Sequence, residues 1–109
     1  MTHWLDYLSY FFGGAFLTNA IPHWVAGLMG EPFQTPFANP SGKGLSSSTV
    51  NVLWAGFNFL AAYVLLVQVG AFDLHATGDV AAAGAGALLL SLVTARLFGA
   101  LHGGNLPRT

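Results

Sequence analysis

Three long apolar runs restrict what this chain can fold into. They cover residues 4–29, 50–70 and 80–102, and each reaches the ~20 residues that an α-helix needs to cross ~30 Å of hydrocarbon. A proline-rich loop over residues 30–49 separates the first two runs. We therefore predict an all-α integral membrane protein, with a single domain over residues 1–109 and three transmembrane helices.

Composition favours a membrane environment and excludes several classes of protein. Seven residues are charged (three Lys or Arg plus four Asp or Glu) and 54 % are hydrophobic, whereas about a quarter of the residues in a soluble domain are charged. The formal net charge of −1 provides no basic field for a nucleic acid. The chain has no cysteine, so a thiol nucleophile and a thiolate metal site are excluded.

The sequence predicts neither an enzyme nor a metal site. The serines gather at residues 46–48, where they suit the start of a helix. No histidine and acid can be placed beside them as a catalytic triad, and the histidines and carboxylates show no tight metal-ligand spacing.

The first loop carries prolines and aromatic residues in an unusual pattern. Pro32, Pro36 and Pro40 follow one another at four-residue spacing, which excludes a regular helix. Loops of this length are usually functional or disordered, and the phenylalanines argue against disorder. We expect an extended strip that lies back on the bundle or on the lipid headgroups. Its candidate functional residues are Glu31, Phe33, Phe37 and Lys43.

The third apolar run contains small residues at every fourth position. On a helix this spacing forms one stripe without bulky side chains. In lipid, such a stripe lets a second helix approach closely, and close packing is the main attraction available there. The predicted packing stripe comprises Ala83, Ala87, Ser91, Ala95, Gly99 and Gly103.

Polar side chains recur inside the predicted spans, where an uncompensated polar group is costly. Counted from the first-loop side, Asn19 and Asn58 lie at nearly the same depth, and Thr94 is close to it. Two interpretations stay open: interhelical hydrogen bonding, or a polar path or small-ligand site between the helices. The predicted cluster comprises Asn19, His23, Asn51, Asn58, Thr94, Arg96 and His102.

Two members of this cluster have several possible roles. His23 follows Pro22, and could donate to a carbonyl left free at Thr18 or Asn19. It could instead titrate in a proton or ion path, or bind haem together with His102. Arg96 could snorkel to the interface or pair with Glu31.

The first functional hypothesis is a small polytopic subunit or scaffold without enzymatic activity, which acts by helix–helix packing. The alternative is a small oligomeric transporter or channel with a polar path along Asn19, His23 and Asn58. A second alternative is a haem-binding membrane subunit, although no cofactor is required by the first two. The predicted partners are the lipid bilayer and either further copies of the chain or another membrane protein, and no nucleic acid.

The few charges predict an orientation. With three crossings, the first loop and the C-terminus share one side of the membrane. The cations fall on that side and three acids on the other, namely Lys43, Arg96 and Arg108 against Asp6, Asp73 and Asp79. The positive-inside rule then predicts a protein of a bacterial inner membrane with its N-terminus outside and its C-terminus in the cytoplasm.

Overall fold

The structure is a computed structural model that describes residues 3–104. It contains three helices and one short hairpin. The elements in chain order are α1 (Trp4–Leu28), β1 (Phe33–Gln34), β2 (Leu45–Ser46), α2 (Ser48–Tyr63), the π-helical turn η1 (Val64–Gln68) and α3 (Thr77–His102). The predicted all-helical protein with three helices is confirmed at this level.

Two of the three helices are long and apolar enough to cross a membrane. They are the continuous helix Ser48–Gln68, formed by α2 and η1, and α3. By the same test of length and composition α1 does not qualify, although it has 25 residues. Its length suffices, but Asn19 and His23 in its second half lower its hydropathy.

The helix ends follow local capping rules. The His3 imidazole accepts the N–H of Leu5, and Asp6 accepts the N–H of His3, both at 3.2 Å, which satisfies free donors at the start of α1. The third helix begins at Thr77, three residues before the predicted start at Val80. It ends at His102, and Gly103 follows with a left-handed φ of 79°, a conformation that glycine adopts without strain.

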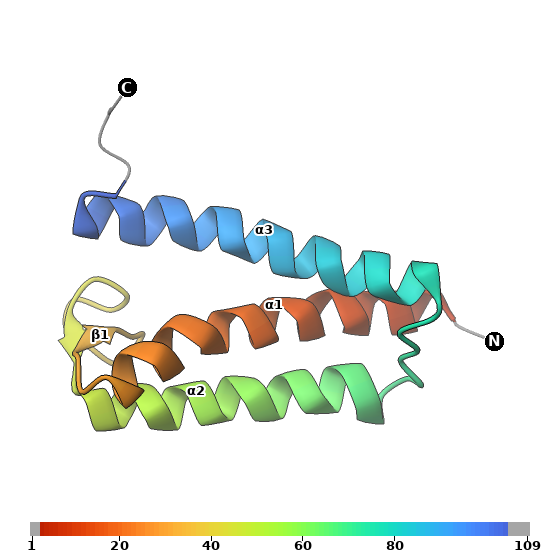
Figure 1. The fold of residues 1–109 in the computed structure, drawn as a ribbon, viewed down its shortest axis with the longest axis horizontal. Helices are drawn as coiled ribbons and strands as arrows, with labels where there is room; N and C mark the ends of the chain where they lie inside the picture. The colour runs from red at the N-terminus through yellow and green to blue at the C-terminus, as the bar shows by residue number, and fades with distance from the viewer. Residues whose placement is uncertain (1–2, 105–109) are drawn as a thin grey trace.

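The central element is α1, which lies between α2 and α3 (Figure 1) and makes the main helix contacts with both. Two glycines allow α1 and α3 to approach backbone to backbone. A Cβ atom on Gly14 would collide with the carbonyl oxygen of Ala83, and one on Gly86 would collide with that of Phe11. The crossing therefore lies in the first half of each helix, and α3 diverges from α1 toward its C-terminal end (Figure 1).

The contact between α1 and η1 includes one hydrogen bond that explains how the wider turn is tolerated. The N–H of Val69 donates to the carbonyl of Val64 at 3.0 Å, so the carbonyl of Leu65 loses its usual helical donor. The hydroxyl of Ser9 donates to this carbonyl at 2.6 Å. A backbone carbonyl that is shielded from water needs a hydrogen-bond partner, and the Ser9 hydroxyl supplies it here.

The loop between α1 and α2 folds back over one end of the bundle. Its two short strands pair antiparallel, with Phe33 opposite Ser46, and the loop sits at the end where α3 has moved away from α1 (Figure 1). Phe33 fills this end, with its ring centroid 4.9 Å from that of Phe98 on α3.

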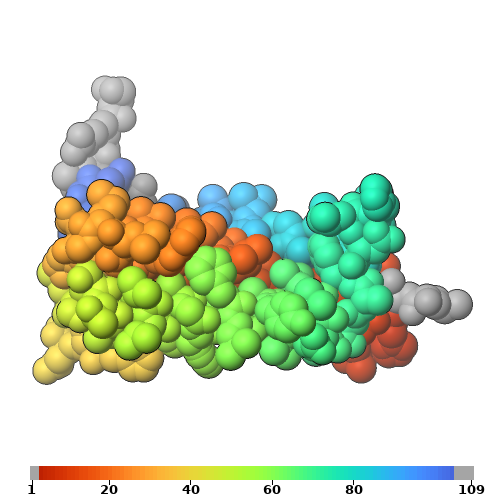
Figure 2. All heavy atoms as spheres, turned by 60° about the horizontal axis from the view of Figure 1, so that its bottom comes forward, coloured from red at the N-terminus to blue at the C-terminus, as the bar shows by residue number. Residues whose placement is uncertain are grey.

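The distribution of apolar and polar side chains is the reverse of that in a typical soluble protein. The buried side chains include alanines and several polar residues, whereas large apolar side chains point outward. Leu53 and Leu60 on α2 and Leu97 on α3 are each at least 60 % exposed. Figure 2 shows the outward face of α2 along the molecule, with the second half of α1 beside it. An apolar surface of this extent is unusual for a soluble monomer.

Candidate functional site

The most completely bonded polar side chain is Asn51, near the start of α2. It is fully buried, and its amide nitrogen lies 3.0–3.2 Å from the carbonyl oxygens of Phe33, Ser46 and Ser47. Its amide oxygen lies 2.8 Å from Nδ1 of His23. Because the amide nitrogen faces three acceptors, the oxygen is the acceptor toward His23 and Nδ1 of His23 carries the hydrogen. Asn51 therefore joins α1, α2 and both strands.

His23 is buried among aromatic rings. Its imidazole makes edge contacts with Phe33, Trp54 and Phe98, at centroid distances of 5.4, 6.4 and 6.5 Å. Its hydrogen bond goes to Asn51, rather than to the carbonyl of Thr18. With a hydrogen on Nδ1, Nε2 of the neutral ring is an acceptor, and within residues 3–104 it has no hydrogen-bond partner.

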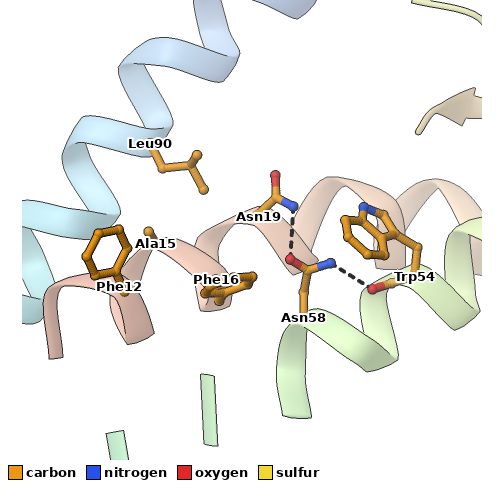
Figure 3. Close-up of a pocket in the computed structure, with 7 residues that line it drawn as sticks. All are labelled: Phe12, Ala15, Phe16, Asn19, Trp54, Asn58 and Leu90. Carbon is orange, nitrogen blue, oxygen red and sulfur yellow. Dashed lines mark hydrogen bonds between the residues drawn. The ribbon is translucent and has the colours of Figure 1, made fainter. Parts of the chain in front are cut away.

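A second pair, Asn19 and Asn58, lies further into the bundle. Nδ2 of Asn19 donates to Oδ1 of Asn58 at 3.0 Å, and Nδ2 of Asn58 donates to the carbonyl of Trp54 at 2.8 Å. Figure 3 shows both bonds, and it shows Oδ1 of Asn19 directed away from Asn58. Throughout the described part of the chain this oxygen receives no hydrogen bond.

Asn19 lines an open groove that is bordered by side chains of α1, α2 and α3. The groove has a volume of about 340 Å³. We call it the Asn19 groove, and its lining is Phe12, Ala15, Phe16, Asn19, Trp54, Asn58 and Leu90 (Figure 3). Its walls are almost entirely apolar apart from the amides. The indole N–H of Trp54 also has no hydrogen-bond partner in residues 3–104.

A smaller cavity of about 150 Å³ lies under the hairpin. We call it the hairpin cavity. Asn19 and Trp54 line both it and the Asn19 groove. Its other polar side chains are His23, Gln34 and Thr35, so it is the more polar of the two spaces.

His102 closes the same end of the bundle from α3. Its Nε2 lies 2.8 Å from Oε1 of Gln34, and its ring stacks on Phe33 at 5.4 Å. Two axial imidazoles of one haem must face each other across the iron, whereas here Phe33 contacts both His23 and His102. The haem hypothesis therefore requires the hairpin to move away.

The remaining members of the predicted cluster lie elsewhere. The hydroxyl of Thr94 donates to the carbonyl of Ser91 on its own helix at 3.2 Å, and the structure does not join it to the two asparagines. Arg96 is exposed. It forms no ion pair with Glu31 or with any other acid in residues 3–104. The seven predicted residues thus fall into three groups. Asn19 bonds to Asn58 and His23 bonds to Asn51, His102 bonds to Gln34 of the hairpin, and Thr94 and Arg96 bond to none of the others.

The predicted stripe on α3 is only partly used within the chain. Ala83 meets Gly14 of α1 and is half-buried, as are Ala87, Gly99 and Gly103, whereas Ser91 and Ala95 are exposed. A row at every fourth residue drifts around a helix that has 3.6 residues per turn. The buried positions Asp79 and Gly86 instead mark the face that packs on α1.

The predicted loop residues differ in their burial. Phe33 is half-buried under α3, whereas Glu31, Phe37 and Lys43 are exposed. The ring of Phe37 lies edge-on to Trp54 at 5.1 Å. Two buried polar residues of the loop, Gln34 and Thr35, were not among the candidates. The hydroxyls of Thr35 and Ser46 lie 2.5 Å apart across the hairpin. In the sequence, the only signal for this hydrogen bond is the position of polar residues next to the phenylalanines of the loop.

Comparison with protein-family models, with curated proteins and with solved structures finds no match to this chain.

Proposed function

We propose that this protein is a small three-span membrane subunit without enzymatic activity, which associates with a helix of a partner membrane protein at the Asn19 groove. One observation carries the proposal: Oδ1 of Asn19 has no donor in residues 3–104 and borders an apolar groove. In the hydrocarbon layer an unsatisfied carbonyl is costly. A partner helix with a hydroxyl or amide side chain would satisfy this oxygen and fill the groove.

Two features support three crossings although α1 is the least apolar helix. At ~1.5 Å per residue, its 25 residues exceed the ~30 Å of a hydrocarbon core. Its most polar side chains, Asn19 and His23, are bonded to Asn58 and Asn51 inside the bundle. Pairing lowers the cost of placing them in lipid. In the proposed orientation the hairpin end with Lys43 and Arg96 faces the cytoplasm.

The absence of cysteine from the chain permits a direct test with single-cysteine variants. Leu90→Cys on α3 places a thiol in the Asn19 groove, and Leu60→Cys on α2 places one on an outward face as a matched control. Each thiol is labelled with a benzophenone maleimide in native membranes and then irradiated. We expect an adduct with a second polypeptide, either another copy or another protein, from Leu90→Cys and not from Leu60→Cys.

A second variant links any adduct to the groove. Ala15→Phe fills the groove from α1 and should abolish the adduct of Leu90→Cys, because the partner helix no longer fits. Equal adducts from Leu90→Cys and Leu60→Cys, or an adduct that survives Ala15→Phe, would contradict the proposal.

A transport function is the second candidate, and one observation favours it. The hairpin cavity and the Asn19 groove share Asn19 and Trp54, so polar groups extend from the hairpin end toward the middle of the bundle. His23 would contribute the free acceptor Nε2 to this path. Flux of protons or small cations into vesicles distinguishes the two functions: transport requires flux that His23→Phe abolishes, whereas a subunit shows none above protein-free vesicles.

A further inference from the structure

A third cavity lies between the loop and α3 at the hairpin end, and it shares Gly42 and Leu97 with the hairpin cavity. Its volume is about 490 Å³. We call it the basic cavity; it is lined on one side by Ser41, Gly42 and Lys43 and on the other by Arg96, Leu97 and Leu101. It thus combines two cationic side chains from different elements with an apolar helix surface.

Neither cation is neutralised within the chain. Lys43 and Arg96 are both exposed, and neither forms an ion pair with any acid in residues 3–104. The acidic residue at the same end, Glu31, is exposed and bonds to neither of them. The cavity therefore presents two uncompensated positive charges.

Backbone and side-chain bonds hold the loop turn that carries Lys43. The N–H of Gly42 donates to the carbonyl of Thr35 at 2.9 Å, and the N–H of Lys43 donates to that of Pro40 at 3.0 Å. The hydroxyl of Ser41 donates to the carbonyl of Pro36 at 2.7 Å. These bonds keep the backbone of Lys43 beside α3.

The position of Arg96 suits the border of a membrane. It precedes the end of α3 at His102 by six residues, or ~9 Å along the helix axis, a distance that an arginine side chain can span by snorkelling toward the headgroups. The neighbouring Leu97 and Leu101 point outward and are 60 % and 44 % exposed. A molecule that satisfies both surfaces carries an anionic head and an apolar tail.

We propose that the basic cavity binds an anionic phospholipid, with the phosphate between Lys43 and Arg96 and an acyl chain along Leu97 and Leu101. The inference depends on the proposed membrane location. Arginine and lysine are the usual phosphate-binding side chains, and basic pockets at the cytoplasmic end of membrane helices bind anionic headgroups. Inorganic phosphate shares the headgroup chemistry but would leave the leucines uncovered.

The test compares spin-labelled phosphatidylglycerol with spin-labelled phosphatidylcholine on protein reconstituted in nanodiscs. Electron paramagnetic resonance then gives the relative association of the two lipids. Each basic side chain that contacts the anionic headgroup contributes about a fivefold preference. We therefore expect about a thirtyfold preference for phosphatidylglycerol in the wild type, a loss of about fivefold in Lys43→Gln or Arg96→Gln, and loss of the whole preference in the double variant.

Arg108→Gln is the matched control, because it removes the same unit of charge from the C-terminal tail. It should keep the preference. An equal loss in Arg108→Gln would contradict the proposal, since it would indicate diffuse attraction rather than this cavity. A preference retained by the double variant, or displacement of phosphatidylglycerol by an equal concentration of inorganic phosphate, would also overturn it.

The failure of this inference is distinguishable from that of the proposed function. Extraction of native membranes with alkaline carbonate is done first. A protein released by carbonate contradicts the membrane location and thus both proposals. A protein that stays inserted but shows no preference for phosphatidylglycerol contradicts the lipid site alone.

Discussion

The closest helix contact makes the sharpest prediction about stability. Gly86 of α3 is buried against the carbonyl oxygen of Phe11, and a Cβ atom there would collide with α1 backbone. Gly84 lies two residues earlier, on the opposite face of the same helix, and a Cβ atom there meets nothing within 4 Å. Both Gly→Ala changes gain helix propensity by about 1 kcal/mol, so their difference isolates the collision.

Overpacking a well-packed contact costs about 1–3 kcal/mol, and a colliding backbone yields less than a side-chain end. We therefore expect the free energy of unfolding of Gly86→Ala to be about 2–3 kcal/mol lower than that of Gly84→Ala. The assay is reversible unfolding in mixed micelles of a mild detergent and dodecyl sulfate, followed by tryptophan fluorescence and circular dichroism. Equal stability of the two variants would refute the close crossing of α1 and α3.

Two further predictions concern hydrogen bonds and use the same unfolding assay. Asn51→Leu leaves the Nδ1 hydrogen of His23 without its acceptor and removes the side-chain donor to the carbonyls of Phe33 and Ser46, whereas the carbonyl of Ser47 keeps the backbone N–H of residue 51. Each buried unsatisfied group costs about 1–3 kcal/mol, so we expect a loss of at least ~3 kcal/mol, against less than ~0.5 kcal/mol for the exposed control Gln68→Leu. Ser9→Ala removes the donor to Leu65 and should cost about 1–2 kcal/mol, whereas Ser91→Ala, whose hydroxyl bonds only within its own helix, should be nearly neutral. A loss for Asn51→Leu no larger than that for Gln68→Leu would contradict the role of Asn51 as the junction of helices and hairpin, and equal effects of the two serine changes would contradict the role of Ser9.

The apolar runs were sufficient to predict three helices, because a helix that long and apolar has few other structures available. Counting residues from the ends of the runs also brought Asn19 and Asn58 to one depth, and the structure joins them by a hydrogen bond. Depth says nothing about direction around a helix axis. Depth alone therefore predicts Thr94 beside this pair, whereas the Thr94 hydroxyl bonds within α3, which diverges from α1 at that end (Figure 1).

The hairpin and its contacts were beyond the reach of sequence patterns. Strands of two residues have no detectable alternation of apolar and polar residues. The acceptors of Asn51 are backbone carbonyls, which every residue possesses, so no residue type marks them. The π-helical turn at Val64–Gln68 is equally unpredictable from local sequence. The hydroxyl that bonds its free carbonyl belongs to Ser9, which lies 56 residues from Leu65 in the chain.

The decisive measurement for the proposed membrane subunit is native mass spectrometry of the protein after extraction in a mild detergent. We expect a complex of this chain with a second polypeptide, and we expect Ala15→Phe, which fills the Asn19 groove, to reduce the mass to that of the single chain. A bare wild-type monomer, or a complex that Ala15→Phe leaves intact, would contradict a subunit that docks a partner helix at this groove.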